Sequence, residues 1–278
     1  MIKVVVDSTA DIPAALREQY DITVVPVLAQ FGNQTFRDDV DITRDEFYAR
    51  LIASPEPPKT AAPSAGMFEE AFRRAAADGG EVLSISLAGA LSGTYNAARQ
   101  GAQLVEGARI VCVDSKTATM SFGFLAIHAA QAIRDGASAP EVALLINALI
   151  QHCHVVFFVD TIEYLEHTGR LSLATSVVGS MQRIKPLMLL DEGEIVPYER
   201  TRTRAKAIEG LYTFIEDFPH VQEVIALYST TPEDVEKLLE KVDPIFPRDQ
   251  VQIMQFGPSI GAHLGPGAMG AAVFEGLD

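Results

Sequence analysis

Hydroxyl side chains lie where a predicted strand gives way to a predicted helix. The strand covers Val82–Leu87, the helix covers Thr94–Leu104, and Ser92 lies in the loop just before the helix. The first N–H groups of a helix have no partner within it, and together with the positive end of the helix dipole they favour an anion. Ser92 could also act only as an N-terminal cap. The candidate anion site therefore comprises Ser92 with Gly93, Thr94 and Asn96.

A histidine near the end of the chain is the second candidate. The segment Gly257–Ala268 is rich in glycine and proline around His263, which predicts a loop whose backbone can approach another surface closely. A histidine there can donate to a carboxylate or a phosphate, and near neutral pH it can do so charged. The alternative is a turn with an incidental surface histidine.

Ser92 and His263 together also allow the interpretation that the protein is a serine esterase or thioesterase. The nucleophile elbow G-x-S-x-G is not met, because Gly89-Ala90-Leu91-Ser92-Gly93 places the serine one residue late. This alternative predicts hydrolysis of acyl esters and labelling by a fluorophosphonate.

A metal site is the next question. His152 and His154 would share one face of a strand, but no second ligand pair lies at suitable spacing. We therefore expect neither a metal site nor a cofactor.

Three further polar segments have less specific signals. Thr60 and Ser64 lie in Ser54–Ala65, which predicts a loop, and taken alone they are turn residues or caps of the next helix. Arg170 follows a glycine after a short predicted helix. The run Arg200–Lys206 is a basic cluster in an acidic chain, either a solvated helix start or a docking patch for an acidic partner or for ATP phosphates. That cluster contains Arg202 and Arg204.

The composition and charge of the chain limit the classes of partner that it can bind. The 278 residues carry a formal charge of −15, with 48% hydrophobic and 21% charged residues, which is typical of a globular protein with a sizeable core. The negative charge argues against nucleic acid or an anionic membrane as partner. A P-loop lysine motif is absent, so ATP binding by this chain is not predicted. No targeting or membrane-spanning segment is recognised, and we expect a cytoplasmic protein.

The two halves of the chain differ in organisation. In the first half apolar strands alternate with helices, beginning with a strand at Lys3–Val6 and a helix that Asp11 would cap, and this predicts a parallel sheet. In the second half Pro186–Leu190 and Ile195–Glu199 predict an antiparallel hairpin, hence a mixed sheet. The fold class is therefore α/β with two domains, and we place the boundary near Ala148–Cys153.

Taken together, the chain resembles the DegV family of bacterial fatty-acid-binding proteins. The order and spacing of the matching segments over the whole length make the resemblance specific. These segments are Asp7-Ser8-Thr9-Ala10-Asp11, Leu91-Ser92-Gly93-Thr94-Tyr95, Val113-Asp114-Ser115-Lys116, Gly169-Arg170, Lys185-Pro186, Arg202-Thr203 and Gly257–Gly270.

The resemblance implies two α/β domains, residues 1–150 with a parallel sheet and residues 151–278 with a mixed sheet, and a C14–C18 fatty acid between them. It further implies that Thr60, Ser92 and His263 hold the carboxylate, supported by Ser64, Gly93, Thr94, Asn96 and Arg170. Two departures from the family pattern reduce the polar neighbours of this anchor: Ala61 and Ala62 follow Thr60, and Leu264 follows the histidine.

The resemblance also implies a partner. In family members paired with an ATP-dependent kinase subunit, the binding protein is not catalytic by itself and presents the carboxylate for phosphorylation, which gives an acyl phosphate for phospholipid synthesis. Arg202 and Arg204 would then meet the kinase. A lipid carrier or sensor without a kinase partner is the alternative, because the same pocket serves both.

The energetics of such a ligand are consistent. Burying about 14 methylenes at roughly 0.8 kcal/mol each provides on the order of 11 kcal/mol before ordering costs. A buried carboxylate must find donors or it costs several kcal/mol. Two hydroxyls, a histidine and helix N-terminal amides meet that need without a permanent full charge.

Overall fold

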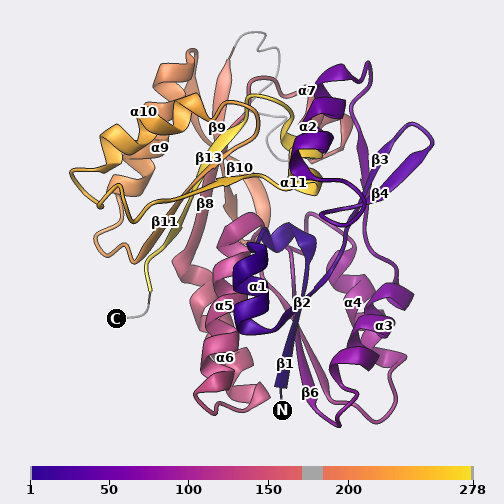
Figure 1. Ribbon diagram of the computed structural model, residues 1–278. Helices are drawn as coiled ribbons and strands as arrows, with labels where there is room; N and C mark the ends of the chain where they lie inside the picture. Colours follow the sequence, from indigo (N-terminus) through magenta and orange to yellow (C-terminus); the bar gives the residue numbers. More distant parts are fainter. Residues whose placement is uncertain (1, 171–183, 277–278) are drawn as a thin grey trace.

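The computed structural model describes residues 2–170 and 184–276. Two sheets organise it into a two-domain α/β fold, one sheet in the lower and one in the upper half of Figure 1. The lower sheet has the strand order β2-β1-β6-β7 and is parallel throughout. Its strands are β1 (Ile2–Asp7), β2 (Ile22–Val25), β6 (Glu81–Ser86) and β7 (Ile110–Asp114).

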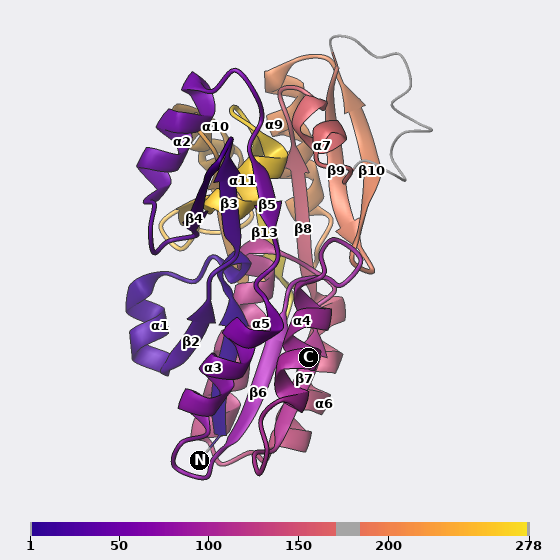
Figure 2. The ribbon, with the colours of Figure 1, turned by 90° about the vertical axis from the view of Figure 1, so that its right-hand side faces the viewer.

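Helices cover both faces of the parallel sheet, as continuous apolar strands require. In β1, Val5 joins the core beneath α3 (Ala65–Ala75) and α4 (Thr94–Gln103), whereas Val4 and Val6 join the core on the opposite face. That opposite face carries α1 (Ala14–Tyr20), α5 (Thr119–Arg134) and α6 (Ala139–Leu149). Figure 2 shows α3 and α4 in front of the sheet.

The upper sheet is mixed, with the order β10-β9-β8-β13-β11-β12. The predicted hairpin is confirmed as β9 and β10, which pair antiparallel. Helices α9 (Arg204–Glu216) and α10 (Glu233–Val242) cover one face. The strands are β8 (Cys153–Phe158), β9 (Lys185–Asp191), β10 (Glu194–Thr201), β11 (Glu223–Tyr228), β12 (Gln252–Gln255) and β13 (Met269–Phe274).

Helix α5 lies between the two sheets and contacts β1 of one and β8 and β13 of the other. Its first half, residues 119–126, is buried on every side, and Phe122, Phe124 and Leu125 are fully buried, whereas Arg134 at its end is exposed. A helix segment buried on every side must pack against other elements on every side. Gly123 allows the closest approach, because a Cβ there would lie 2.7 Å from the carbonyl oxygen of Ala10.

A third, antiparallel sheet with the order β4-β3-β5 was not predicted. Its strands are β3 (Leu28–Phe31), β4 (Gln34–Arg37) and β5 (Lys59–Ala61), and α2 (Arg44–Ala53) follows β4. The strand β5 corrects the prediction of a plain loop over Ser54–Ala65. This sheet and α2 contact α11 (Pro258–Leu264), so a segment of the first half of the chain packs beside the second half.

Three other sequence predictions need correction. Asp11 does not cap α1, which Pro13 precedes; it ends the 3-10 turn Ser8–Ala10 with a positive φ of 54° and is buried. Helix α6 was missed, and Gly257–Ala268 is not all loop, since α11 occupies its first half. Residue 150 falls at the short turn Ile150–His152 between α6 and β8, and the boundary there remains a prediction.

Candidate functional site

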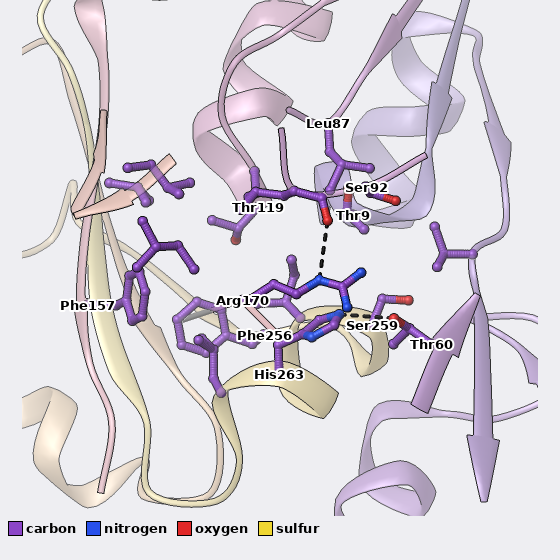
Figure 3. Close-up of a pocket in the computed structure, with 18 of the residues that line it drawn as sticks. Thr9, Thr60, Leu87, Ser92, Thr119, Phe157, Arg170, Phe256, Ser259 and His263 are labelled. Atoms are coloured by element: carbon purple, nitrogen blue, oxygen red, sulfur yellow. Dashed lines mark hydrogen bonds between the residues drawn. The ribbon is translucent and has the colours of Figure 1, made fainter. Parts of the chain in front are cut away.

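A cavity lies where the carboxyl ends of β1 and β6 meet the inner face of the mixed sheet (Figure 3). The volume of the cavity is about 160 Å³. Residues of β5, of the loop before α4, of β8 and of α11 line it. The cavity is therefore built by both halves of the chain.

The three predicted anchor residues all reach this cavity. Thr60 lies on β5 and His263 on α11, and the Thr60 Oγ1 and His263 Nε2 atoms are 3.0 Å apart in a hydrogen bond (Figure 3). Ser92 lies in the loop before α4, and its Oγ is 2.9 Å from Oγ1 of Thr94. One end of the cavity thus has a cluster of uncharged polar groups.

His263 is neutral at physiological pH. Burial, reinforced by the nearby positive charge of Arg170, lowers the pKa of its imidazole from 6.5 to about 3. Its Nδ1 atom is buried and has no hydrogen-bond partner among the described residues. When Nε2 carries the proton, His263 donates to Thr60, and the Thr60 hydroxyl is then free to donate to a ligand oxygen in the cavity.

The loop before α4 shows why Ser92 faces the cavity. Gly93 occupies the N-terminal cap position of α4, so Ser92 precedes the cap, and its Oγ accepts a weak bond of 3.3 Å from the N–H of Thr94. Gly93 and Thr94 also line the cavity. The helix start therefore directs the hydroxyls of Ser92 and Thr94, with the positive end of the α4 dipole, toward the same region.

Arg170 brings the one full positive charge that the described lining residues supply. Its Nε donates to the carbonyl oxygen of Leu91 at 3.3 Å (Figure 3). Its Nη1 donates to the carbonyl oxygen of Thr168. Burial lowers the pKa of the guanidinium, which stays protonated. Arg170 is tied to the loop that carries Ser92 and raises the positive potential at the polar end.

The part of the cavity wall that the mixed sheet supplies is apolar. Phe157 on β8, Leu227 on β11 and Phe256 after β12 are buried side chains of its wall (Figure 3). Leu190 and Ile195 from the β9–β10 hairpin complete this part. An amphiphile with a small polar head and an apolar tail matches the two ends of this cavity.

Other predicted residues lie elsewhere. Ser64 caps α3 by accepting from the N–H of Met67 at 3.3 Å, and neither Ser64 nor Asn96 is among the described lining residues. Arg204 differs from the expected docking role, since its guanidinium is bound within the chain. It donates to Asp160 at 2.9 Å and to the Gly267 carbonyl at 2.7 Å, and it also pairs with Asp234.

Sequence reasoning missed three polar lining residues. Thr9, Thr119 and Ser259 all contribute to the cavity. Thr119 has a φ of 54°, a left-handed conformation that is unusual for a β-branched residue, and its hydroxyl donates to Asp11 at 2.9 Å. The only available signal for Thr9 was its position after the first strand, where ligands of α/β folds gather.

The hydrolase and metal alternatives find no geometric support in the described part of the chain. Ser92 bonds to Thr94, whereas His263 bonds to Thr60, so the two residues do not form a nucleophile–base pair there. His154, one of the two histidines considered for a metal, pairs instead with Glu275 at 2.8 Å.

Residues 2–170 and 184–276 contain no group of three or more histidine, cysteine or acidic side chains that could hold a metal. Across those same ranges, every helix is too short or too polar to cross a bilayer.

The fold is that of a two-domain α/β protein. A largely apolar cavity lies between its two sheets, and one end of this cavity is polar. A model of the DegV family, described as uncharacterised, matches residues 1–276. The chain belongs to the DegV family. It is 31% identical over 273 residues to protein DegV of Bacillus subtilis, with 97% of each chain covered.

Solved structures agree with the assignment. A DegV family protein from Thermus thermophilus, described for its fatty acid binding, superposes with a TM-score of 0.90 at 30% identity and covers 99% of both chains. The B. subtilis DegV structure, described as a fatty acid binding protein, gives 0.89 at 31% identity, over 98% of this chain and 99% of that one. A stearic-acid-binding protein from Eubacterium ventriosum gives 0.89 at 27% identity, over 99% and 98%.

Proposed function

We propose that this protein binds a long-chain fatty acid of 14 to 18 carbons, a range suggested by its family. The tail lies in the apolar part of the cavity, between the domains formed by residues 1–150 and 151–278. The observation that carries the proposal is a single cavity with apolar walls and a cluster of neutral hydrogen-bonding groups at one end. The fatty-acid-binding relatives support it.

The carboxylate is held by Thr60, Ser92 and His263. Thr94 and Gly93 support Ser92 from the start of α4, and Arg170 adds positive charge beside them. The hydroxyl of Ser92 and the guanidinium of Arg170 can donate to a carboxylate oxygen, and the hydroxyl of Thr60 can do so when His263 Nε2 carries the proton that joins the two side chains. The low-dielectric surroundings strengthen these bonds. Ser64 acts indirectly as the N-terminal cap of α3, and Asn96 acts indirectly from the first turn of α4.

The direct test is mass spectrometry of an organic extract of the purified, denatured protein. We expect close to one C14–C18 fatty acid per chain, because burial of the tail makes dissociation slow. A protein first stripped of lipid and then incubated with palmitate should regain it. An extract without lipid, together with no uptake of palmitate, would contradict the proposal and favour a small polar anion at Ser92 and His263.

We further propose that the protein acts in the cytoplasm as the acyl-carrying subunit of a two-component fatty acid kinase, in phospholipid metabolism. It performs no chemistry alone; a separate kinase subunit phosphorylates the presented carboxylate with ATP. The exposed Arg202, at the turn between β10 and α9, supports a docking surface there. Arg204 contributes by fixing this turn to Asp160 and Gly267.

Reversing the charge at Arg202 separates binding from turnover. Arg202→Glu should leave palmitate affinity unchanged and reduce kcat/KM for kinase-dependent acyl phosphate formation by about tenfold at low salt, because exposed charges chiefly steer association. The matched control is Arg74→Glu, whose side chain is 72% exposed on α3. Equal loss of lipid binding and turnover would exclude docking by Arg202. A carrier or sensor function would instead give no acyl phosphate with any candidate kinase.

A further inference from the structure

The short helix α11 carries His263 and is anchored at its beginning by two carboxylates from the first half of the chain. The N–H of Gly257, the residue before the helix, donates to Asp11 Oδ1 at 3.0 Å. The N–H of Ser259, in the first turn, donates to Asp38 Oδ2 at 3.2 Å. The proline at the first helical position has no N–H. Two free donors of the helix start thus meet negative charge supplied from other elements.

Asp38 makes the more concentrated set of contacts. Its Oδ2 atom also accepts from the hydroxyl of Ser259 at 2.6 Å and from the hydroxyl of Ser8 at 3.0 Å. The Ser8 hydroxyl in turn accepts from the N–H of Val27 at 3.0 Å. One oxygen of Asp38, which is 1% exposed, therefore joins the end of β1, the segment before β3 and the start of α11.

The other end of α11 has no freedom to compensate for a change at Ser259. A Cβ on Gly261 would lie 2.6 Å from the Tyr48 hydroxyl, and that hydroxyl donates to the carbonyl oxygen of Phe256 at 3.0 Å. Gly265, with a φ of 75°, ends the helix against the ring of Tyr164. His263 lies one turn after Ser259, so its imidazole moves with the helix start.

We propose that Asp38, with Ser259 as its partner, is a positioning residue for His263: it fixes α11 so that the imidazole lies at hydrogen-bonding distance from Thr60 and faces the polar end of the cavity. Asp38 does not touch the ligand. Its effect on binding passes through the helix, and Asp11 has the same role at Gly257. The proposal rests on the proposed fatty-acid binding for its affinity readout and on His263 alone for its spectroscopic one.

The test compares Asp38→Ala, Ser259→Ala, their double variant and Asp38→Asn, each stripped of lipid. Palmitate affinity should fall roughly tenfold in each alanine variant, by no more in the double variant, and little in Asp38→Asn, whose amide oxygen still accepts from Ser259. The imidazole NMR signals of His263 should shift in the alanine variants. Asp41→Ala, an exposed carboxylate on the same loop, is the control and should leave both readouts unchanged.

Two results would overturn the proposal. Additive losses of affinity in the double variant would mean that Asp38 and Ser259 act separately. An unchanged His263 spectrum in Asp38→Ala, with only a lower melting temperature, would show a purely structural carboxylate. If Asp38→Ala does not fold, Ser259→Ala and Asp38→Asn carry the same comparison. If the wild-type protein takes up no palmitate, the proposed function fails while the His263 signals still decide the positioning role.

Discussion

Replacing both Ser92 and His263 with alanine is expected to weaken palmitate binding by about a hundredfold, with roughly tenfold for each single variant. Ser92→Ala removes a donor to the buried carboxylate, and His263→Ala removes the hydrogen-bond partner of the Thr60 hydroxyl. Each loss costs on the order of 1–3 kcal/mol. The apolar wall is untouched, so the tail still contributes its burial energy. Isothermal titration of lipid-stripped protein measures the three affinities.

His220→Ala is the matched control for this experiment, because His220 is exposed after α9 and is not among the described lining residues of the cavity. It should bind palmitate as the wild type does. Thermal unfolding of every variant without ligand separates loss of the anchor from loss of the fold. If both Ser92→Ala and His263→Ala keep full binding and support full phosphorylation, the anchor assignment is wrong.

The second large effect is a pH dependence of stability carried by buried carboxylates. Burial raises the pKa of Asp38 from its ordinary 3.8 to about 6, although Ser259 and Ser8 donate to it, and the charge of Asp39 adds to the rise. Burial likewise raises the pKa of Asp7 to about 6 and of Asp11 to about 7. Between pH 4 and pH 6 the folded protein therefore holds protons that the unfolded chain has released.

The direction in which the unfolding free energy changes with pH follows from this difference in bound protons. A raised carboxyl pKa stabilises the folded state at low pH, and this stability is lost as pH rises through the folded pKa. Asp38→Asn removes the ionisation, so relative to wild type the variant should gain on the order of 2 kcal/mol of unfolding free energy between pH 4 and pH 8. Urea unfolding at several pH values measures the gain.

Asp41→Asn serves as the control for the pH experiment. Asp41 is exposed, and hydrogen bonds from the Arg37 side chain and N–H lower its pKa to about 2, so its linkage acts only below pH 4. His263 acts in the opposite direction to Asp38: its lowered pKa reduces stability as pH falls from 6.5 toward 3. A constant difference between Asp38→Asn and wild type from pH 4 to pH 8 would contradict the assignment of a raised pKa.

Much of the fold could be predicted because its signals are local. Apolar runs such as Val4–Val6, alternation with helices and the hairpin turn after Asp191 each depend on neighbouring residues. The strand β5 was missed because only three residues pair, and its partner β3 lies about thirty positions earlier. Helix α11 was missed because its seven residues include a glycine and a proline, and contacts with α2 and with α7 (Glu163–His167) stabilise it.

The site was predicted to a similar extent and for the same reason. Ser92 has a local signal, a hydroxyl before a helix start, and His263 was noticed by its unusual surroundings. The roles of Thr60 and Arg170 came only from resemblance, since nothing local distinguishes them from turn residues. Asp38 and Ser259 could not be recognised, because they meet across 221 positions. The internal partners of Arg204, which are Asp160, Gly267 and Asp234, could not be predicted either, because they are likewise distant in sequence.

The burial of helix α5 between the two sheets has a consequence for the chain as a whole. One continuous core includes Val4 and Val6 of the parallel sheet, Phe124 of α5, and Phe157 and Leu227 of the mixed sheet. Neither sheet can open without exposing the surface that the other shares with α5, so the two domains form one cooperative unit in unfolding. The proposed fatty acid, enclosed between them, would then stabilise both at once, so its addition should raise the global rather than the local resistance of the protein to denaturation.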